Sequence, residues 1–226
     1  MRIIHVSDMH GTFPTLPDGD VVISSGDDLP NASRGNLEIE PFFQRNWIRS
    51  RLQEYLEWLG GKPFIRVAGN HDFCPMLCPM LNDIGIDAND ITNRHYVFKG
   101  QRMYGFPYIP YIAGEWNFEC TTSDMARQVR KLKDVFTTTG IDILVAHAPI
   151  ANILDNAYDD HIGNPQIKDL FQYILEEKQL PKLYLHGHNH EQPGYEKIGD
   201  ILVVNAATTV KIIEYTASSG WAVVGK

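Results

Sequence analysis

The stretch FIRVAGNHD, residues 64–72, decides how this chain is organised. Its first five residues form a short, β-rich run, and a glycine followed by polar side chains ends that run. Similar runs at residues 3–7, 21–25, 141–146 and 182–186 are also followed directly by polar clusters. The sequence therefore predicts five strands that each place polar side chains at the carboxyl end.

The polar clusters after these runs are Asp8-Met9-His10, Gly26-Asp27, Gly69-Asn70-His71-Asp72, His147, and Gly187-His188-Asn189-His190. If the strands are parallel neighbours, the clusters meet at one sheet edge, where open α/β folds bind ligands. Alternate residues of an extended segment point the same way, so Asp8 with His10 can reach one site. Carboxylate and amide oxygens and imidazole nitrogens suit hard or borderline divalent ions. The sequence therefore predicts a two-metal hydrolase.

The order Asp-x-His, Gly-Asp, Gly-Asn-His-Asp, a lone His and Gly-His-x-His, over residues 8–190, resembles the signature of the calcineurin-like metallophosphoesterase superfamily. The chain most resembles small bacterial and vertebrate metallophosphodiesterases, similar to class III cyclic nucleotide phosphodiesterases. Residues 20–27, 68–72, 104–108, 116–118 and 204–207 carry this likeness. The resemblance implies an α/β fold, a four-layer αββα sandwich of two mixed β-sheets flanked by helices.

The resemblance also assigns ligands. One ion would be held by Asp8, His10, Asp27 and His190, and the other by Asp27, Asn70, His147 and His188. Asp27 would bridge the two ions. We expect two divalent ions, with Mn²⁺ as the first choice and Fe, Zn, Ni or Mg as alternatives. Asp28 is a competitor for the bridging position, and His147 taken alone would be read as an ordinary buried or surface histidine.

The catalytic residues that the resemblance implies are His71 and Asp72. In the similar enzymes a metal-bridging hydroxide attacks phosphorus, while the histidine corresponding to His71 stabilises the leaving oxygen. Asp72 is expected to orient His71, with a plain surface position as the alternative. Many relatives carry a further aspartate three residues after the bridging one, where this chain has Pro30. A partner that orients His71 must then come from elsewhere.

Four residues are candidates for binding substrate: Tyr108, Tyr111, Trp116 and His161. The first three belong to a segment dense in aromatic residues and proline, residues 104–118, which borders the site in the similar phosphodiesterases. Exposed aromatic rings there could stack on a nucleobase, and His161 could line the pocket mouth. The alternatives are core packing for the rings and a simple turn position for His161.

Helical spacing predicts helices over residues 37–59, ending at Gly60-Gly61, and from Pro165 until Pro181 ends the segment. A third helix carries the basic cluster of residues 127–133 on its solvated face. The tail predicts strands over residues 201–204, 210–215 and 221–224. This mixture of elements suggests two facing sheets flanked by helices.

Composition fits one soluble domain over residues 1–226, with 43% hydrophobic and 21% charged residues. No stretch is apolar enough to cross a bilayer, and the N-terminal apolar run is too short for a secretory signal. Three cysteines suit a reducing compartment, so we expect a cytoplasmic protein. The net charge of −8 argues against binding duplex nucleic acid. The sequence leaves the oligomeric state open.

The sequence therefore predicts a metal-dependent phosphodiesterase that hydrolyses small, cyclic-nucleotide-like diesters. A metal-dependent nuclease and a phosphomonoesterase or phosphoprotein phosphatase are the alternative enzymes. A noncatalytic scaffold on the same fold is the alternative of another class, and the intact set of ligands disfavours it.

Overall fold

Two six-stranded sheets form the centre of the protein in the computed structural model, which describes residues 1–177 and 181–225 and leaves out the side chains of residues 173–177. The first sheet has the order β16-β15-β1-β2-β3-β4. Its strands are β1 (Arg2–Val6), β2 (Val21–Ser24), β3 (Phe64–Arg66), β4 (Ala88–Asp90), β15 (Val210–Thr216) and β16 (Gly220–Val224). Strands β1 to β4 are parallel, and β15 and β16 are antiparallel to their neighbours.

The second sheet has the order β13-β14-β12-β9-β6-β5. Its strands are β5 (His95–Phe98), β6 (Gln101–Phe106), β9 (Ile143–Ala146), β12 (Leu183–His186), β13 (Gly194–Ile198) and β14 (Ile201–Asn205). Strands β6, β9, β12 and β14 are parallel, and each edge strand is antiparallel. Two short ribbons, β7 (Ile109–Pro110) with β8 (Glu119–Cys120) and β10 (Asn156–Ala157) with β11 (Asp160–His161), lie outside the two sheets.

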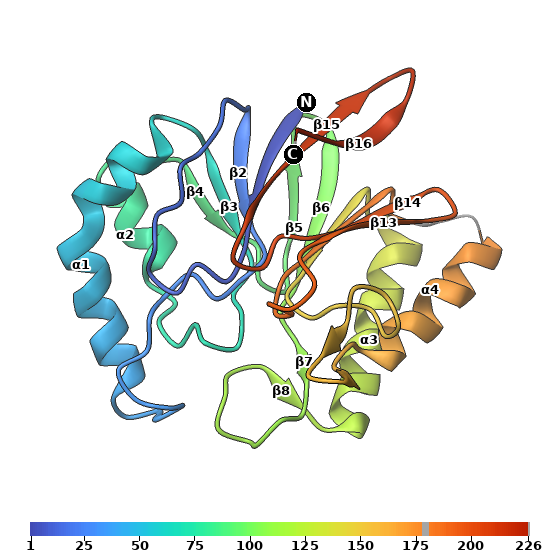
Figure 1. Ribbon diagram of the computed structural model, residues 1–226, viewed down its shortest axis with the longest axis horizontal. Helices are drawn as coiled ribbons and strands as arrows, with labels where there is room; N and C mark the ends of the chain where they lie inside the picture. The colour runs from blue at the N-terminus through green and yellow to red at the C-terminus, as the bar shows by residue number, and fades with distance from the viewer. Residues whose placement is uncertain (178–180, 226) are drawn as a thin grey trace.

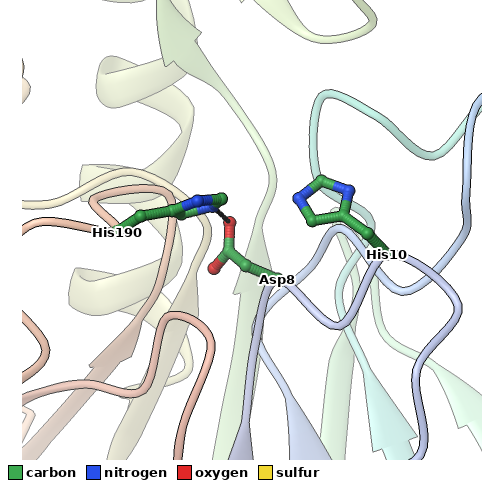
Figure 2. A group of neighbouring side chains, drawn as sticks. All are labelled: Asp8, His10 and His190. Atoms are coloured by element: carbon green, nitrogen blue, oxygen red, sulfur yellow. Dashed lines mark hydrogen bonds and ion pairs between the residues drawn. The ribbon is translucent and has the colours of Figure 1, made fainter.

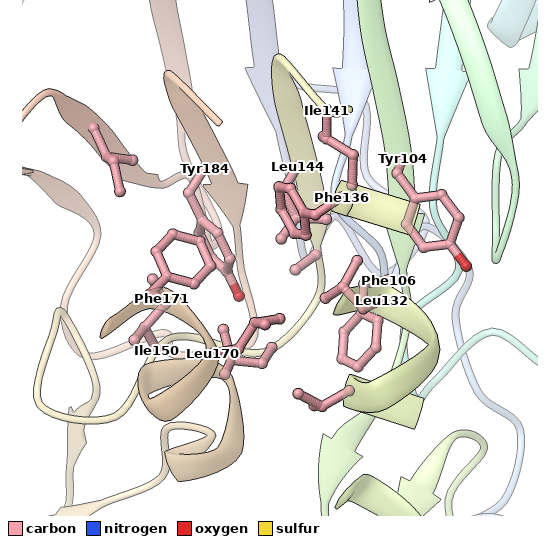
Figure 3. Close-up of a cluster of buried hydrophobic side chains, with 14 of the residues drawn as sticks. Tyr104, Phe106, Leu132, Phe136, Ile141, Leu144, Ile150, Leu170, Phe171 and Tyr184 are labelled. Atoms are coloured by element: carbon pink, nitrogen blue, oxygen red, sulfur yellow. The ribbon is translucent and has the colours of Figure 1, made fainter. Parts of the chain in front are cut away.

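Helices cover the outer faces of both sheets. Helices α1 (Glu40–Leu59) and α2 (Leu77–Asp83) lie beside the first sheet, and α3 (Thr122–Thr138) and α4 (Pro165–Glu177) lie beside the second (Figure 1). Apolar clusters fill both of these helix–sheet interfaces; Figure 3 shows the one beneath α3 and α4. A third cluster lies between the sheets and includes Ile3, Ile65 and Leu185. The predicted αββα sandwich is confirmed.

The alternation of side chains along each strand explains this layering. In β1, Ile4 and Val6 pack in the cluster that faces the helices, whereas Ile3 packs between the sheets. Both faces of the strand are buried from Ile3 to Val6, so apolar residues occupy both faces, and His5 is the one buried polar residue among them. The five predicted strands are present and divide between the two predicted sheets: β1, β2 and β3 belong to one sheet, and β9 and β12 to the other.

Local signals explain the helix ends. Helix α1 begins three residues later than predicted and stops at Gly60, which adopts a left-handed φ of 54°. Helix α3 starts after Thr121, whose side chain accepts a hydrogen bond from the Asp124 amide. Helix α4 begins at Pro165 as predicted, and the residues before Pro181 where we expected it to end, 178–180, lie outside the described residues. None of the described helices is long and apolar enough to cross a bilayer.

Candidate metal centre

All seven predicted ligands lie in loops that directly follow parallel strands. Asp8 and His10 follow β1, and the other ligands follow the neighbouring β2 and β3 and the second-sheet strands β9 and β12. Backbone hydrogen bonds tie these loops together, from the Asp8 amide to the Gly26 carbonyl and from the Gly187 amide to the His147 carbonyl. The carboxyl ends of two sheets therefore converge on one volume, as expected of strands that carry a shared site.

The first group of potential ligands consists of Asp8, His10 and His190, whose donor atoms lie within 4.8 Å of one another. Figure 2 shows the Asp8 carboxylate between the two imidazoles, with its Oδ1 3.0 Å from His190 Nε2. The other carboxylate oxygen accepts a hydrogen bond from the His188 amide, at 2.9 Å. The Asp8 carboxylate is therefore held in place by the loop that carries two other predicted ligands.

The second group consists of Asp27, His147 and His188. The Nε2 atom of His147 lies 2.9 Å from Asn70 Oδ1 and 3.3 Å from Asp27 Oδ2. Its Nδ1 atom faces the Ser25 carbonyl oxygen at 2.8 Å. A histidine that ligates a metal commonly donates its other ring nitrogen to a backbone carbonyl, and His147 has that arrangement. Asn70 thereby joins the group as an amide oxygen donor.

Asp27 connects these groups, because it also clusters with His10 and His71. A single carboxylate that lies within reach of both sets of donors has the position that a bridging ligand needs. Asp28 does not compete for this place, since its carboxylate pairs with Arg66 and Ser24 instead. The geometry therefore favours Asp27 over Asp28.

Four of the predicted ligands have a strained backbone. Asp8, His10, Asp27 and His188 all have positive φ values, of 54°, 44°, 56° and 65°. Residues other than glycine rarely adopt this left-handed region, and such strain gathers at functional sites where the surrounding structure enforces it. Each of these ligand loops follows a buried strand, which fixes the backbone on the N-terminal side of the turn.

Two motif glycines are required because other atoms come too close. A Cβ atom on Gly187 would overlap the Ser7 hydroxyl and the Asp8 carboxylate, and one on Gly69 would overlap the Asp27 carboxylate. Neither glycine is needed for a positive φ. Their role is to let the ligand-bearing loops approach one another.

The electrostatics of the centre fit cations. Burial lowers the pKa of His188 to about 4, which keeps its imidazole neutral and free to act as a ligand. At His147 burial has the same tendency, but the charge of Asp27 outweighs it and raises the pKa to about 9. Two buried carboxylates thus draw a positive charge into this position. Together with imidazole and amide donors, this set of residues fits divalent metal ions.

The ring of His71 is held on two sides. Its Nδ1 lies 2.5 Å from Asn31 Oδ1, and the Asn31 amide also donates to the His71 carbonyl at 3.2 Å. The Trp116 ring packs against the imidazole with 4.1 Å between centroids. Burial lowers the pKa of His71. Asn31, one residue beyond Pro30, is the orienting partner that sequence reasoning did not find.

Asp72 does not contact the ring of His71, and the expectation that it orients this ring is wrong. Its carboxylate accepts hydrogen bonds from the backbone amides of Asp27, Leu29 and Gly69, and it forms an ion pair with Arg66. Asp72 is also buried, so a surface position is excluded. The residue joins the loop after β2 to the loop after β3 and so holds two predicted ligands in register.

A cavity of about 500 Å³ opens above these groups. Its lining includes Asp27, Asn70, His71, His188 and His190, together with residues of two separate loops. The lining residues of these loops include Pro110, Tyr111, Ile112 and Trp116 in one and Tyr158, Asp160 and His161 in the other.

Three of the four predicted substrate contacts, Tyr111, Trp116 and His161, are in the cavity lining. Tyr108 is absent from it: its ring packs against Phe106 and Phe118, and its hydroxyl accepts from Asn93. The prediction for Tyr108 therefore needs correction, because its ring packs against the apolar cluster beneath α3 and α4. Ile112 and Tyr158 also line the cavity and are exposed, but the sequence did not reveal them because they belong to no motif.

Comparisons with known proteins agree with this geometry. The sequence profile of calcineurin-like phosphoesterases matches residues 1–192. The chain is similar to the human metallophosphoesterase domain-containing protein 1, with 26% identity over 91% of this chain. The chain spans 65% of the length of that human relative, and of the mouse relative of the same name.

Two solved structures have a similar fold. One is a putative 5′-nucleotidase from Staphylococcus aureus, solved in complex with alpha-ketoglutarate, with a TM-score of 0.53 and 13% identity over 99% of this chain and 52% of that one. The other is the phosphopantetheinyl hydrolase of Mycobacterium tuberculosis, with a TM-score of 0.51 and 13% identity over 92% of this chain and 89% of that one. At this identity the likeness is one of fold.

Proposed function

Because the chain belongs to the calcineurin-like phosphoesterase family, we propose that it is a phosphodiesterase that hydrolyses small phosphodiesters with two bound divalent ions. The observation that carries this proposal is the pair of donor groups that surround Asp8 and Asp27. Membership of the family implies hydrolysis of phosphoesters. The preference for diesters and for small substrates rests on the residues around the cavity.

The residues that would hold the ions are the seven predicted ligands, with Asp27 shared. Bound there, divalent ions would polarise the phosphoryl group and neutralise its charge in the transition state. We expect Mn²⁺ to serve, with Fe, Zn, Ni or Mg as alternatives. The net charge of −8 makes this local positive charge important, since an anionic substrate would otherwise be repelled.

His71 is the residue that we propose as the proton donor to the leaving oxygen. Asn31 Oδ1 faces its Nδ1, so in the protonated ring the hydrogen on Nε2 is the one left for the substrate. Trp116 covers one face of the ring, excludes water from it and limits its rotation. His71 also lies beside His10, with 4.8 Å between ring centroids, so it borders the predicted ligands.

The walls of the cavity support a small organic diester. Tyr111 and Tyr158 are exposed beside the cavity, at 58% and 89%, and offer rings against which a planar group could stack. No arginine or lysine is among the residues that line this cavity in the described part of the chain. A long nucleic acid backbone needs such cations, so we propose a small diester or nucleotide rather than a duplex or a membrane as the partner.

The test combines metal content with a panel of substrates. We expect the purified protein, loaded with Mn²⁺ and desalted, to hold about two ions per chain by elemental analysis, and a chelator to abolish activity. Bis(p-nitrophenyl) phosphate and cyclic AMP should be hydrolysed faster than p-nitrophenyl phosphate or long RNA. Asp27→Asn should weaken both metal sites, whereas Asp83→Asn, an exposed carboxylate at the end of α2, serves as the matched control.

Each competing function predicts a different result from this panel. Faster hydrolysis of the monoester would favour a phosphomonoesterase, and cleavage of RNA without activity on small diesters would favour a nuclease. The noncatalytic scaffold would be favoured if the protein bound no more than one ion per chain at saturation and hydrolysed none of the substrates.

A further inference from the structure

One part of the cavity lining comes from the short ribbon β10–β11 and the loops beside it. It comprises residues 151–163, and the residues of it that line the cavity are Ala157, Tyr158, Asp160, His161, Ile162 and Gly163. None of these residues belongs to the motifs that identify the family. We call this segment the hairpin wall.

The hairpin wall is fastened to the loop that carries two predicted metal ligands. Asn189 lies between His188 and His190 and is fully buried. Its side-chain amide donates to the carbonyls of Leu154 and Asn156, at 2.9 and 3.0 Å. The position of the hairpin wall is therefore fixed relative to the metal centre.

A buried carboxylate orients a histidine of this wall. Asp155 is 2% exposed, and its Oδ1 lies 2.9 Å from Nδ1 of His161, whose side chain is 56% exposed. The other carboxylate oxygen accepts from the amides of Asn152 and Gly163, at 2.9 and 3.2 Å. A Cβ atom on Gly163 would lie 2.7 Å from this oxygen, so the loop is shaped around the carboxylate.

The pairing decides what His161 can offer to a ligand. With the Nδ1 hydrogen directed at Asp155, the Nε2 atom of the neutral ring is a hydrogen-bond acceptor. Two carboxylates, Asp160 and Glu191, line the same cavity. This part of the lining therefore presents acceptors, beside the exposed ring of Tyr158. A second phosphate would be repelled here, and a hydroxyl or amino group would be bound.

We propose that the Asp155–His161 pair is a specificity site that binds the alcohol portion of the substrate. It selects esters whose alcohol carries hydroxyl or amino donors and a flat or apolar face, with no second anionic group beside the hairpin wall. His161 contacts the substrate, and Asp155 is the positioning residue. The site rests on the proposed function, because the metal centre in the lining of the same cavity would hold the phosphoryl group.

Two esters with the same leaving group test the site. The p-nitrophenyl ester of adenosine 5′-monophosphate has hydroxyl and amino donors on its alcohol, and methyl p-nitrophenyl phosphate has none. We expect His161→Ala to lower the ratio of their kcat/KM values about fivefold to tenfold, the scale of one lost hydrogen bond. His161→Gln, which keeps an acceptor, should recover part of the ratio. Asp159→Asn, an exposed position of the same hairpin wall outside the cavity lining, is the control.

The positioning role has its own measurement. Asp155→Asn should lower the same ratio, and adding it to His161→Ala should cause little further loss, because both changes remove one interaction. In nuclear magnetic resonance spectra of metal-free protein, adenosine 5′-monophosphate should shift the imidazole resonance of His161, and methyl phosphate should not. This second measurement is independent of turnover.

The outcomes separate this inference from the proposed function. Equal losses on both esters in His161→Ala, or an unchanged ratio, would overturn the specificity site while the enzyme remains a metal-dependent phosphodiesterase. An unshifted His161 resonance would also count against the site. A wild-type protein that hydrolyses neither ester with any divalent metal would overturn the proposed function, and the specificity site with it.

Discussion

Replacing Arg66 by methionine should strongly destabilise the protein, although Arg66 is not among the predicted ligands or catalytic residues. The guanidinium is 1% exposed and forms three ion pairs: Nε with Asp28 at 2.6 Å, Nη2 with Asp72 at 2.6 Å and Nη1 with Asp90 at 3.1 Å. Asp28 and Asp72 are themselves 0% and 1% exposed. Without Arg66, two buried carboxylates would lose their counter-charge.

The expected cost follows from this burial. Breaking a buried ion pair by removing one partner typically costs about 3–5 kcal/mol, because the remaining charge is left uncompensated. Small domains have about 5–15 kcal/mol of stability in total, so Arg66→Met should remain foldable but be severely destabilised. The matched control is Arg102→Met, which removes an exposed ion pair with Asp142 and should cost about 0–1 kcal/mol.

Urea denaturation followed by circular dichroism measures both variants. A second substitution sharpens the test: Asp28→Asn added to Arg66→Met should recover part of the lost free energy of unfolding, because a neutral amide replaces an unpaired charge. Asp28→Asn alone should destabilise the wild type. If Arg66→Met costs no more than Arg102→Met, or if Asp28→Asn makes the Arg66→Met protein worse, the reasoning about buried charge is refuted.

Two further predictions concern histidines. His71→Ala should leave metal content unchanged but lower turnover roughly 10²- to 10⁴-fold for an alkyl ester, and by less for a nitrophenyl ester, whose leaving group needs little protonation; equal defects on both would contradict proton donation, and Asn31→Ala should show the same pattern more weakly. Burial, and to a smaller extent the charge of His186, lower the pKa of His5 to about 3. The free energy of unfolding should therefore fall as the pH drops below about 6.5, because His5 binds a proton in the unfolded chain but stays neutral in the folded one. His5→Gln should remove about 2 kcal/mol of this loss by pH 5 in urea titrations, and parallel stability–pH curves for both proteins would contradict it.

The candidate metal centre could be located from the sequence because each cluster of predicted ligands is local. Every cluster directly follows a short run of β-type residues, and the turn beside the strand end fixes where its side chains go. The assignment of strands to sheets could not be predicted in this way. Two sheets were expected, but strand composition does not tell which neighbours pair within them. Strands β5 and β6 were also missed, although Lys99 and Gly100 between them have the positive φ values of a tight hairpin turn.

The partners of the ligands and of His71 were out of reach of the sequence for a different reason. Asn31 contacts His71 across 40 positions of the chain, and its place is shifted one residue beyond the expected one. Arg66 had a usable signal, since a lone arginine within a buried strand requires counter-charges. Its partners Asp28 and Asp72 are next to predicted ligands in the sequence, and this position suggested roles in the chemistry. In the structure they contact Arg66 and the backbone instead.

The difference between the two parts of the site explains where sequence reasoning succeeds and where it ends. The strained ligands Asp8 and Asp27 sit within three residues of a buried strand, which determines their backbone directly. The two loops that line the cavity are positioned by side chains instead. The Glu119 carboxylate accepts hydrogen bonds from four backbone amides of residues 112–116, and the Asn189 side-chain amide donates to the hairpin wall. Both loops are positioned by side-chain hydrogen bonds and by short ribbons outside the two sheets, so no motif at a strand end marks them. The candidate ligands therefore stand where motifs reveal them, whereas the proposed choice of substrate rests on contacts that only the folded chain brings together.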